Sequence, residues 1–110
     1  MDGDFDDYIF REHPDYSVQL GELAANEGLS LHDIRLALRY TFHLIKRNPA
    51  SFDQVALTEF GSLHVAKTLP YIVGDGAYVP ALQLTYHVID DEQTIELVKI
   101  ERRRDAEAPA

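Results

Sequence analysis

The chain has 110 residues, of which 45 % are apolar and none is cysteine, so it suits one domain with one core and excludes disulfide or thiolate chemistry. Its net charge of −9 disfavours generic nucleic-acid binding, which depends on neutralised phosphates. No apolar run approaches the roughly 20 residues that span a membrane.

The acid excess lies at the N-terminal end, where residues 1–31 hold eight acids and one base. This acidic start differs from a signal peptide, which opens with positive charge followed by an apolar block. We therefore expect a cytoplasmic protein with no membrane segment. Residues 1–7 and 105–110 are expected to fray, at the two ends of a single domain that spans residues 1–110.

The first half of the chain predicts an edge strand at residues 8–11 and two helices. Pro14 suits the first turn of a helix, and Gly28 is the expected stop. Ser30 caps a second helix that ends at Asn48. The apolar residues of the second helix extend well past half of its circumference, so we expect this helix to be covered on two sides.

The second half predicts strands. Residues 63–72 alternate in part and are interrupted by Pro70, and residues 81–89 alternate clearly between apolar and polar positions. A polar turn at residues 90–93 leads into a return strand at residues 94–101, whose apolar phase shifts and indicates a bulge. The predicted fold class is α+β, a two-layer β-α-α-β-β-β domain with both helices packed on an antiparallel sheet.

Few residues form a recognisable chemical motif. The sequence lacks a glycine-rich phosphate loop, a nucleophile elbow and a paired acid and base. The histidines do not have the close spacing that metal ligands use, so we predict no metal and no cofactor. They are His13, His32, His43, His64 and His87.

The strands carry the candidate catalytic residues. They are Lys67, Tyr86, His87, Arg102, Arg103 and Arg104. At one edge of a three-stranded meander, these side chains would combine cations for a phosphate, an imidazole and a phenol, which are the groups for cleaving a phosphodiester through a ribose hydroxyl. In the alternative interpretation Tyr86 is a core residue, His87 is solvated, and the arginines pair with Glu101 and Asp105.

The order of elements resembles the RelE/ParE toxin superfamily of bacterial toxin–antitoxin modules. The likeness is strongest in residues 44–49 and in the hairpin of residues 84–105. That hairpin has an aromatic strand, an acidic turn, an apolar strand and the ending Arg102-Arg103-Arg104-Asp105, which is similar to the His-Arg-Arg-Asp ending of the family. The resemblance matches Lys67 to one basic position, and it places Arg102 where the family has histidine and Glu107 where it has a closing tyrosine.

The resemblance implies a toxin that cleaves mRNA on the ribosome as an endoribonuclease or inhibits DNA gyrase, and that a small antitoxin neutralises. The departures from the family pattern favour a gyrase-type, degenerate or purely binding member. The competing hypothesis is a non-catalytic acidic interaction module that forms a homodimer or binds a basic partner. A small-molecule enzyme is a third hypothesis, which no motif supports.

Overall fold

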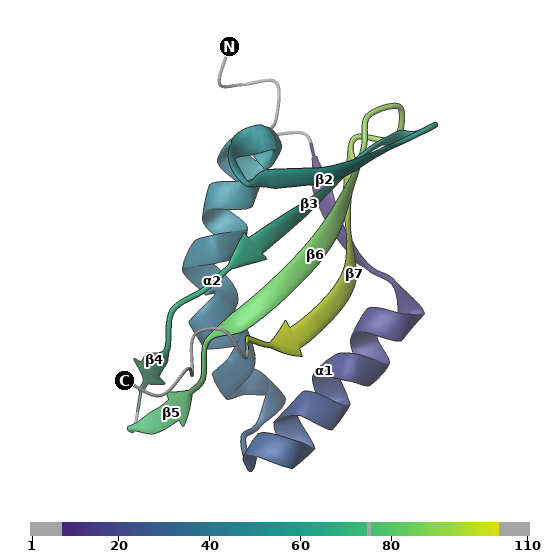
Figure 1. The fold of residues 1–110 in the computed structure, drawn as a ribbon. Helices are drawn as coiled ribbons and strands as arrows, with labels where there is room; N and C mark the ends of the chain where they lie inside the picture. Colours follow the sequence, from purple (N-terminus) through teal and green to yellow (C-terminus); the bar gives the residue numbers. More distant parts are fainter. Residues whose placement is uncertain (1–7, 75, 104–110) are drawn as a thin grey trace.

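The computed structural model describes residues 8–74 and 76–103 and shows an α+β fold (Figure 1). The helices are α1 (Pro14–Glu27), α2 (Leu31–Arg47) and the short 3-10 helix η2 (Pro49–Ser51). The strands are β1 (Ile9–Glu12), β2 (Asp53–Thr58), β3 (Gly61–Lys67), β4 (Tyr71–Val73), β5 (Ala77–Val79), β6 (Leu82–Ile89) and β7 (Thr94–Arg102). The main sheet has the order β1-β7-β6-β3-β2, and β4 and β5 form a separate two-stranded sheet.

Both helices begin and end where the sequence predicts. Pro14 opens α1, and Gly28 closes it with a left-handed backbone at φ 67°. The Ser30 side chain accepts a hydrogen bond of 3.0 Å from the Asp33 amide at the start of α2, and Asn48 follows its last residue. Local capping signals therefore set these boundaries. Within the part of the chain that the structure describes, no helix is long and apolar enough to cross a lipid bilayer.

The β6–β7 hairpin and its bulge are also confirmed. Thr85 lies opposite Lys99, whereas Tyr86 lies opposite Leu97, so Val98 is left without a partner in the pairing. The edge position of β1 is confirmed as well, but β1 pairs with β7 in parallel. The sheet is therefore mixed, and the expectation of a purely antiparallel sheet is wrong.

Strand β2 and the separate β4–β5 hairpin were not predicted. Strand β2 occupies residues 53–58 with nearly all of its side chains exposed, so it lacks the alternation that marks a half-buried strand. The predicted strand at residues 63–72 is split at the interruption expected from Pro70, because β3 ends at Lys67 and β4 belongs to a separate hairpin.

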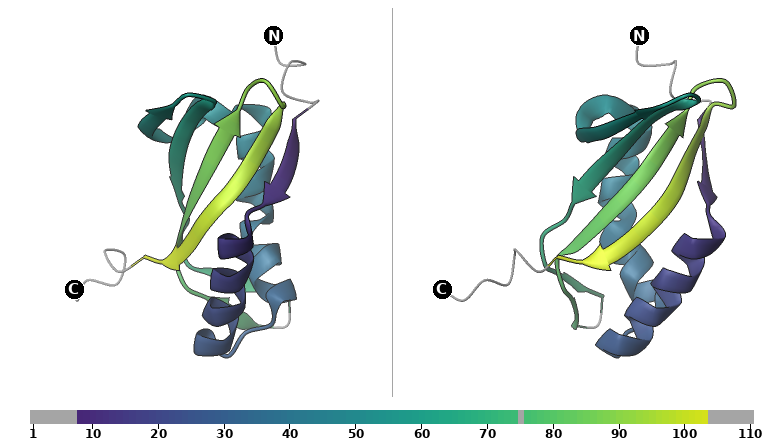
Figure 2. Two further views of the ribbon diagram at one scale, coloured as in Figure 1. Left: turned by 90° about the vertical axis from the view of Figure 1, so that its right-hand side faces the viewer. Right: turned by 45° about the vertical axis from the view of Figure 1, so that its right-hand side comes forward.

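The core lies between the sheet and the helices, which the two views in Figure 2 show from the side. Ile34, Leu38 and Ile45 of α2 are fully buried in this layer, and Leu84 of β6 is buried there too. The other apolar side of α2 remains partly open, and Tyr40 on it is 70 % exposed. The expectation that α2 is covered on two sides holds in part, because Leu36, Ala37 and Phe42 also pack against the core, and the exposed strip at Tyr40 contributes to the site described next.

Candidate functional site

Tyr86, a predicted catalytic residue, belongs to the core. Its side chain is 0 % exposed, and its hydroxyl donates a hydrogen bond of 2.6 Å to the carbonyl oxygen of Pro49. The ring stacks on His64 with centroids 5.3 Å apart and meets Phe52 edge-on. Burial raises the pKa of the phenol above its ordinary value. The structure thus keeps this hydroxyl neutral and away from solvent.

Lys67 and His87 lie on the opposite face of the sheet, which no helix of the described residues covers. Lys67 lies opposite Gln83, and His87 lies opposite Leu63 in β3 and Glu96 in β7. His87 Nε2 is 2.7 Å from the Thr58 hydroxyl. Lys67 lies opposite Gln83, which is four residues from His87 on β6. The backbone positions of Lys67 and His87 are therefore about 13 Å apart along the strand direction. The structure places them on one face without bringing them into contact.

The described C-terminal arginines contact other elements of the fold. Arg102 Nη1 lies 2.7 Å from a carboxylate oxygen of Glu27, near the end of α1. Arg103 Nη1 donates a hydrogen bond of 2.8 Å to the carbonyl oxygen of Thr68, where β3 has just ended. Arg104 lies outside the described residues. The structure therefore does not gather the predicted set at one edge, because Tyr86 faces inward and the two described arginines bind other elements.

A buried histidine network was missed by the sequence analysis. His64 is 3 % exposed, and its Nδ1 is 3.0 Å from the Phe52 carbonyl oxygen while its Nε2 is 2.8 Å from the Ser62 hydroxyl. A carbonyl only accepts, so Nδ1 donates to Phe52, and in the neutral ring Nε2 accepts from Ser62. The network fixes the chain just before β2, including the Phe52 ring.

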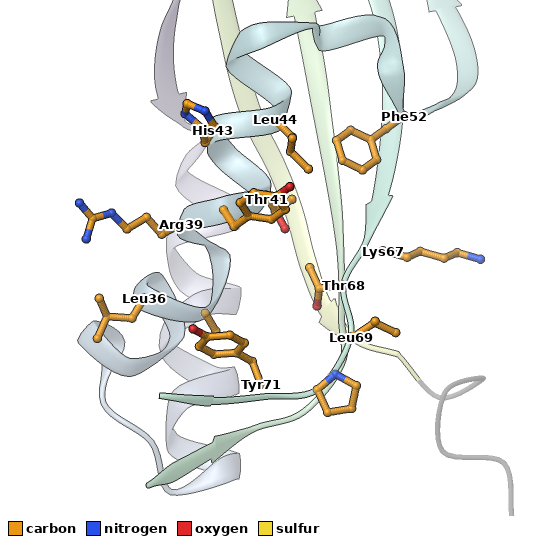
Figure 3. A pocket seen from close by; sticks show the side chains of 13 residues that line it. Leu36, Arg39, Thr41, His43, Leu44, Phe52, Lys67, Thr68, Leu69 and Tyr71 are labelled. Carbon is orange, nitrogen blue, oxygen red and sulfur yellow. The ribbon is translucent and has the colours of Figure 1, made fainter. Parts of the chain in front are cut away.

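A groove of about 830 Å³ lies between α2 and the chain that runs from β3 into β4 (Figure 3). Figure 3 shows Leu44 and Phe52 at one end of the groove and Tyr71 at the other, with Thr41 and Thr68 between them. The apolar side chains of its lining are Leu36, Ala37, Tyr40, Leu44, Phe52, Leu69, Pro70 and Tyr71. We use the name groove face for Leu36, Tyr40, Leu44, Leu69 and Tyr71.

The groove face is unusually exposed for apolar side chains. Leu69 is 77 % exposed and Tyr71 is 55 % exposed. In the β4–β5 hairpin, Val73 and Val79 share the face of Tyr71 and are buried, whereas the exposed Ile72 and Tyr78 lie on the other face. Single exposed apolar residues are ordinary, but a contiguous patch beside a hollow marks a binding surface.

The charge at the groove is opposite to that of the chain. The charged or basic residues of its described lining are Arg39, His43 and Lys67, with no carboxylate among them. Helix α2 holds four of the ten bases and one of the nineteen acids, so its net charge is +3 and that of the remaining chain is −12. The most basic helix of the described fold therefore forms one side of this groove.

Neither a metal nor a known relative identifies this site. Among the described residues, no group of three or more histidine, aspartate or glutamate side chains could hold a metal ion. No family model matches the sequence, and no curated protein matches it either. What the arrangement supports is binding, through an apolar floor and cationic edges.

Proposed function

We propose that this protein is an interaction module that binds a segment of another protein in the groove between α2 and β4. The observation that carries the proposal is the groove face, where three large apolar side chains (Tyr40, Leu69 and Tyr71) are each more than half exposed around one hollow. Burying such side chains contributes roughly 25 cal/mol for each Å² removed from water. The cysteine-free composition supports a reducing compartment such as the cytoplasm as the place of action.

The chemistry of the groove favours an acidic partner. Arg39 and His43 of α2 lie along one side of the apolar floor, and the described lining of the groove holds no carboxylate. A second copy of the chain docked through the same face would bring these cations against their own equivalents, which is unfavourable. We therefore propose a separate partner with carboxylates beside its apolar residues, in place of the basic partner or homodimer suggested by the net charge.

Photo-crosslinking tests this function in the cells that encode the protein. A benzophenone amino acid placed at Tyr40 lies on the groove face, and one placed at Val18, an exposed apolar position of α1, is the matched control. We expect one adduct of defined mass from position 40 and none from position 18. Equal labelling at both positions, or no adduct at position 40, would overturn the proposal.

A toxin-like activity on mRNA or gyrase is a second proposal, and an antitoxin-like small protein would then be the partner in the groove. It is favoured by Lys67 and His87, whose positions on one open sheet face leave room for an extended ligand. Expression in bacteria without a partner should then arrest growth, and Lys67→Ala combined with His87→Ala should relieve the arrest. Normal growth at high expression would count against this activity and would leave the binding proposal intact.

A further inference from the structure

Resting on the proposed function, we infer that the partner segment is an acidic α-helix that lies along α2, with its carboxylates beside a row of basic side chains on that helix. The row consists of Arg39, His43 and Arg47, which we name the basic row. These residues are spaced at i, i+4 and i+8 on α2, so they lie one above the other on its surface. All three are exposed.

An apolar row runs next to the basic row. Leu36, Tyr40 and Leu44 have the same spacing of four, displaced by one residue, which is about 100° around the helix. Side chains at a spacing of four form the ridge that packs into the groove between the ridges of another helix. Helix α2 thus presents an apolar ridge for contact and a parallel line of cations on the side that faces solvent.

The side chains of the basic row form no ion pair with any residue that the structure describes. The ion pairs among the described residues involve Arg11, Arg35, Lys99 and Arg102 together with His13, but no member of the basic row. Arg35 would extend the row by one turn, but it lies 3.5 Å from Glu12. The basic row therefore begins where internal pairing stops, and it runs beside the groove to the end of α2.

A helix fits this site better than an added strand. The groove wall opposite α2 includes Pro70, which has no N–H to donate, and β4 is only three residues long, with one edge already paired with β5. Strand addition requires a row of unpaired backbone groups. The apolar ridge instead matches the helix-in-groove mode, in which a partner helix inserts side chains spaced at three and four residues. From Leu36 to Leu44 the ridge extends about 12 Å, or a little over two turns.

A set of synthetic peptides separates helix and charge. The first peptide has about 18 residues, leucine at helical spacing and glutamate on both flanks of the leucine stripe. The second replaces glutamate by glutamine, and the third has the composition of the first in an order without helical periodicity. Binding of each peptide to the full chain is followed by NMR chemical-shift changes, which also locate the site.

We expect the glutamate peptide to shift the amide signals of the groove face and to bind at least fivefold more tightly than the other two peptides. Its affinity should fall as the salt concentration rises from about 50 to about 300 mM, because screening weakens exposed charge pairs. Arg39→Glu should weaken binding about fivefold, in line with the worth of an exposed pair. The control Lys99→Glu makes the same charge change on the open sheet face and should alter affinity less than twofold.

The outcomes separate this inference from the proposed function. Equal binding of the glutamate and glutamine peptides would refute the basic row as a recognition element. Equal binding of the aperiodic peptide would refute the helix. Either result, or shifts mapped away from α2, would overturn the inference while a crosslink at Tyr40 still supported the groove. Absence of that crosslink would remove the proposed function itself.

Discussion

The hydroxyl of Tyr86 offers a direct test of whether this residue serves stability. Tyr86→Phe keeps the ring and its contacts with His64 and Phe52 but removes the donor to the buried carbonyl of Pro49. An unsatisfied buried carbonyl costs about 1–3 kcal/mol. We expect the free energy of unfolding near pH 7 to fall by about 2 kcal/mol, measured by urea denaturation and far-UV circular dichroism.

The effect should depend on pH. Burial raises the pKa of Tyr86 in the folded protein, whereas the phenol in the unfolded chain ionises near pH 10. Below pH 10 both states hold the proton and the stabilisation is fully present, and above pH 10 it is lost because the unfolded state loses its proton first. At about pH 11 the wild-type protein should therefore lose about 1.4 kcal/mol that the phenylalanine variant does not lose. The penalty of the substitution then shrinks from about 2 to about 0.6 kcal/mol.

Tyr16 is buried and has a raised pKa in both proteins, so its contribution cancels in the comparison. Tyr40→Phe is the control, because its side chain is 70 % exposed and the change should alter stability near pH 7 by less than about 0.5 kcal/mol. A Tyr86→Phe penalty that is the same at both pH values would refute the buried, neutral phenol. It would also return Tyr86 to the list of catalytic candidates.

Two further substitutions test the sheet, and one on α1 serves as a comparison. Gly61→Ala would place Cβ 1.8 Å from the Val88 carbonyl oxygen, so strand β3 must shift. We expect the free energy of unfolding to fall by about 3 kcal/mol, measured by thermal denaturation. Gly21→Ala, with open space around it on α1, should instead raise the free energy of unfolding by about 0.5–1 kcal/mol. Ser62→Ala leaves Nε2 of buried His64 without its donor and should lower the free energy of unfolding by about 1–2 kcal/mol, measured by urea denaturation. An unchanged denaturation midpoint would show that the network is not formed.

The elements that the sequence predicts are those whose signals are local. Helix caps at Ser30 and Gly28, and the phase shift at Val98, depend on residues within one or two turns of the feature. The parallel pairing of β1 with β7 joins segments more than 80 residues apart, and no local pattern encodes it. Strand β2 lies at an edge with its side chains exposed, which removes the alternation that identifies a strand.

The candidate site illustrates the same limit. Tyr86 and His87 are consecutive on one strand and therefore face opposite sides of the sheet, so the period of two already argues against their joint action. The groove joins α2 to residues 67–71, and its position follows from tertiary packing alone. Its one signal in the sequence was the excess apolar width of α2, which we interpreted as burial on two sides. The structure covers part of that width and leaves Tyr40 exposed.

Net charge is a poor guide to the partner of this protein because recognition depends on the charge at the binding surface. The acids of the described chain are distributed over the ends of α1, the β6–β7 turn and the sheet, and several of them pair with Arg11, Arg35, Lys99 and Arg102. The basic row has no such pairing and lies beside the apolar ridge. An acidic partner would be repelled at long range by a chain of −9, so attraction must act within the Debye length of about 10 Å at 0.1 M salt. From zero added salt up to about 50 mM, the affinity should therefore rise, because salt screens the long-range repulsion. At higher salt the affinity should fall, because the short contacts along α2 are then screened as well.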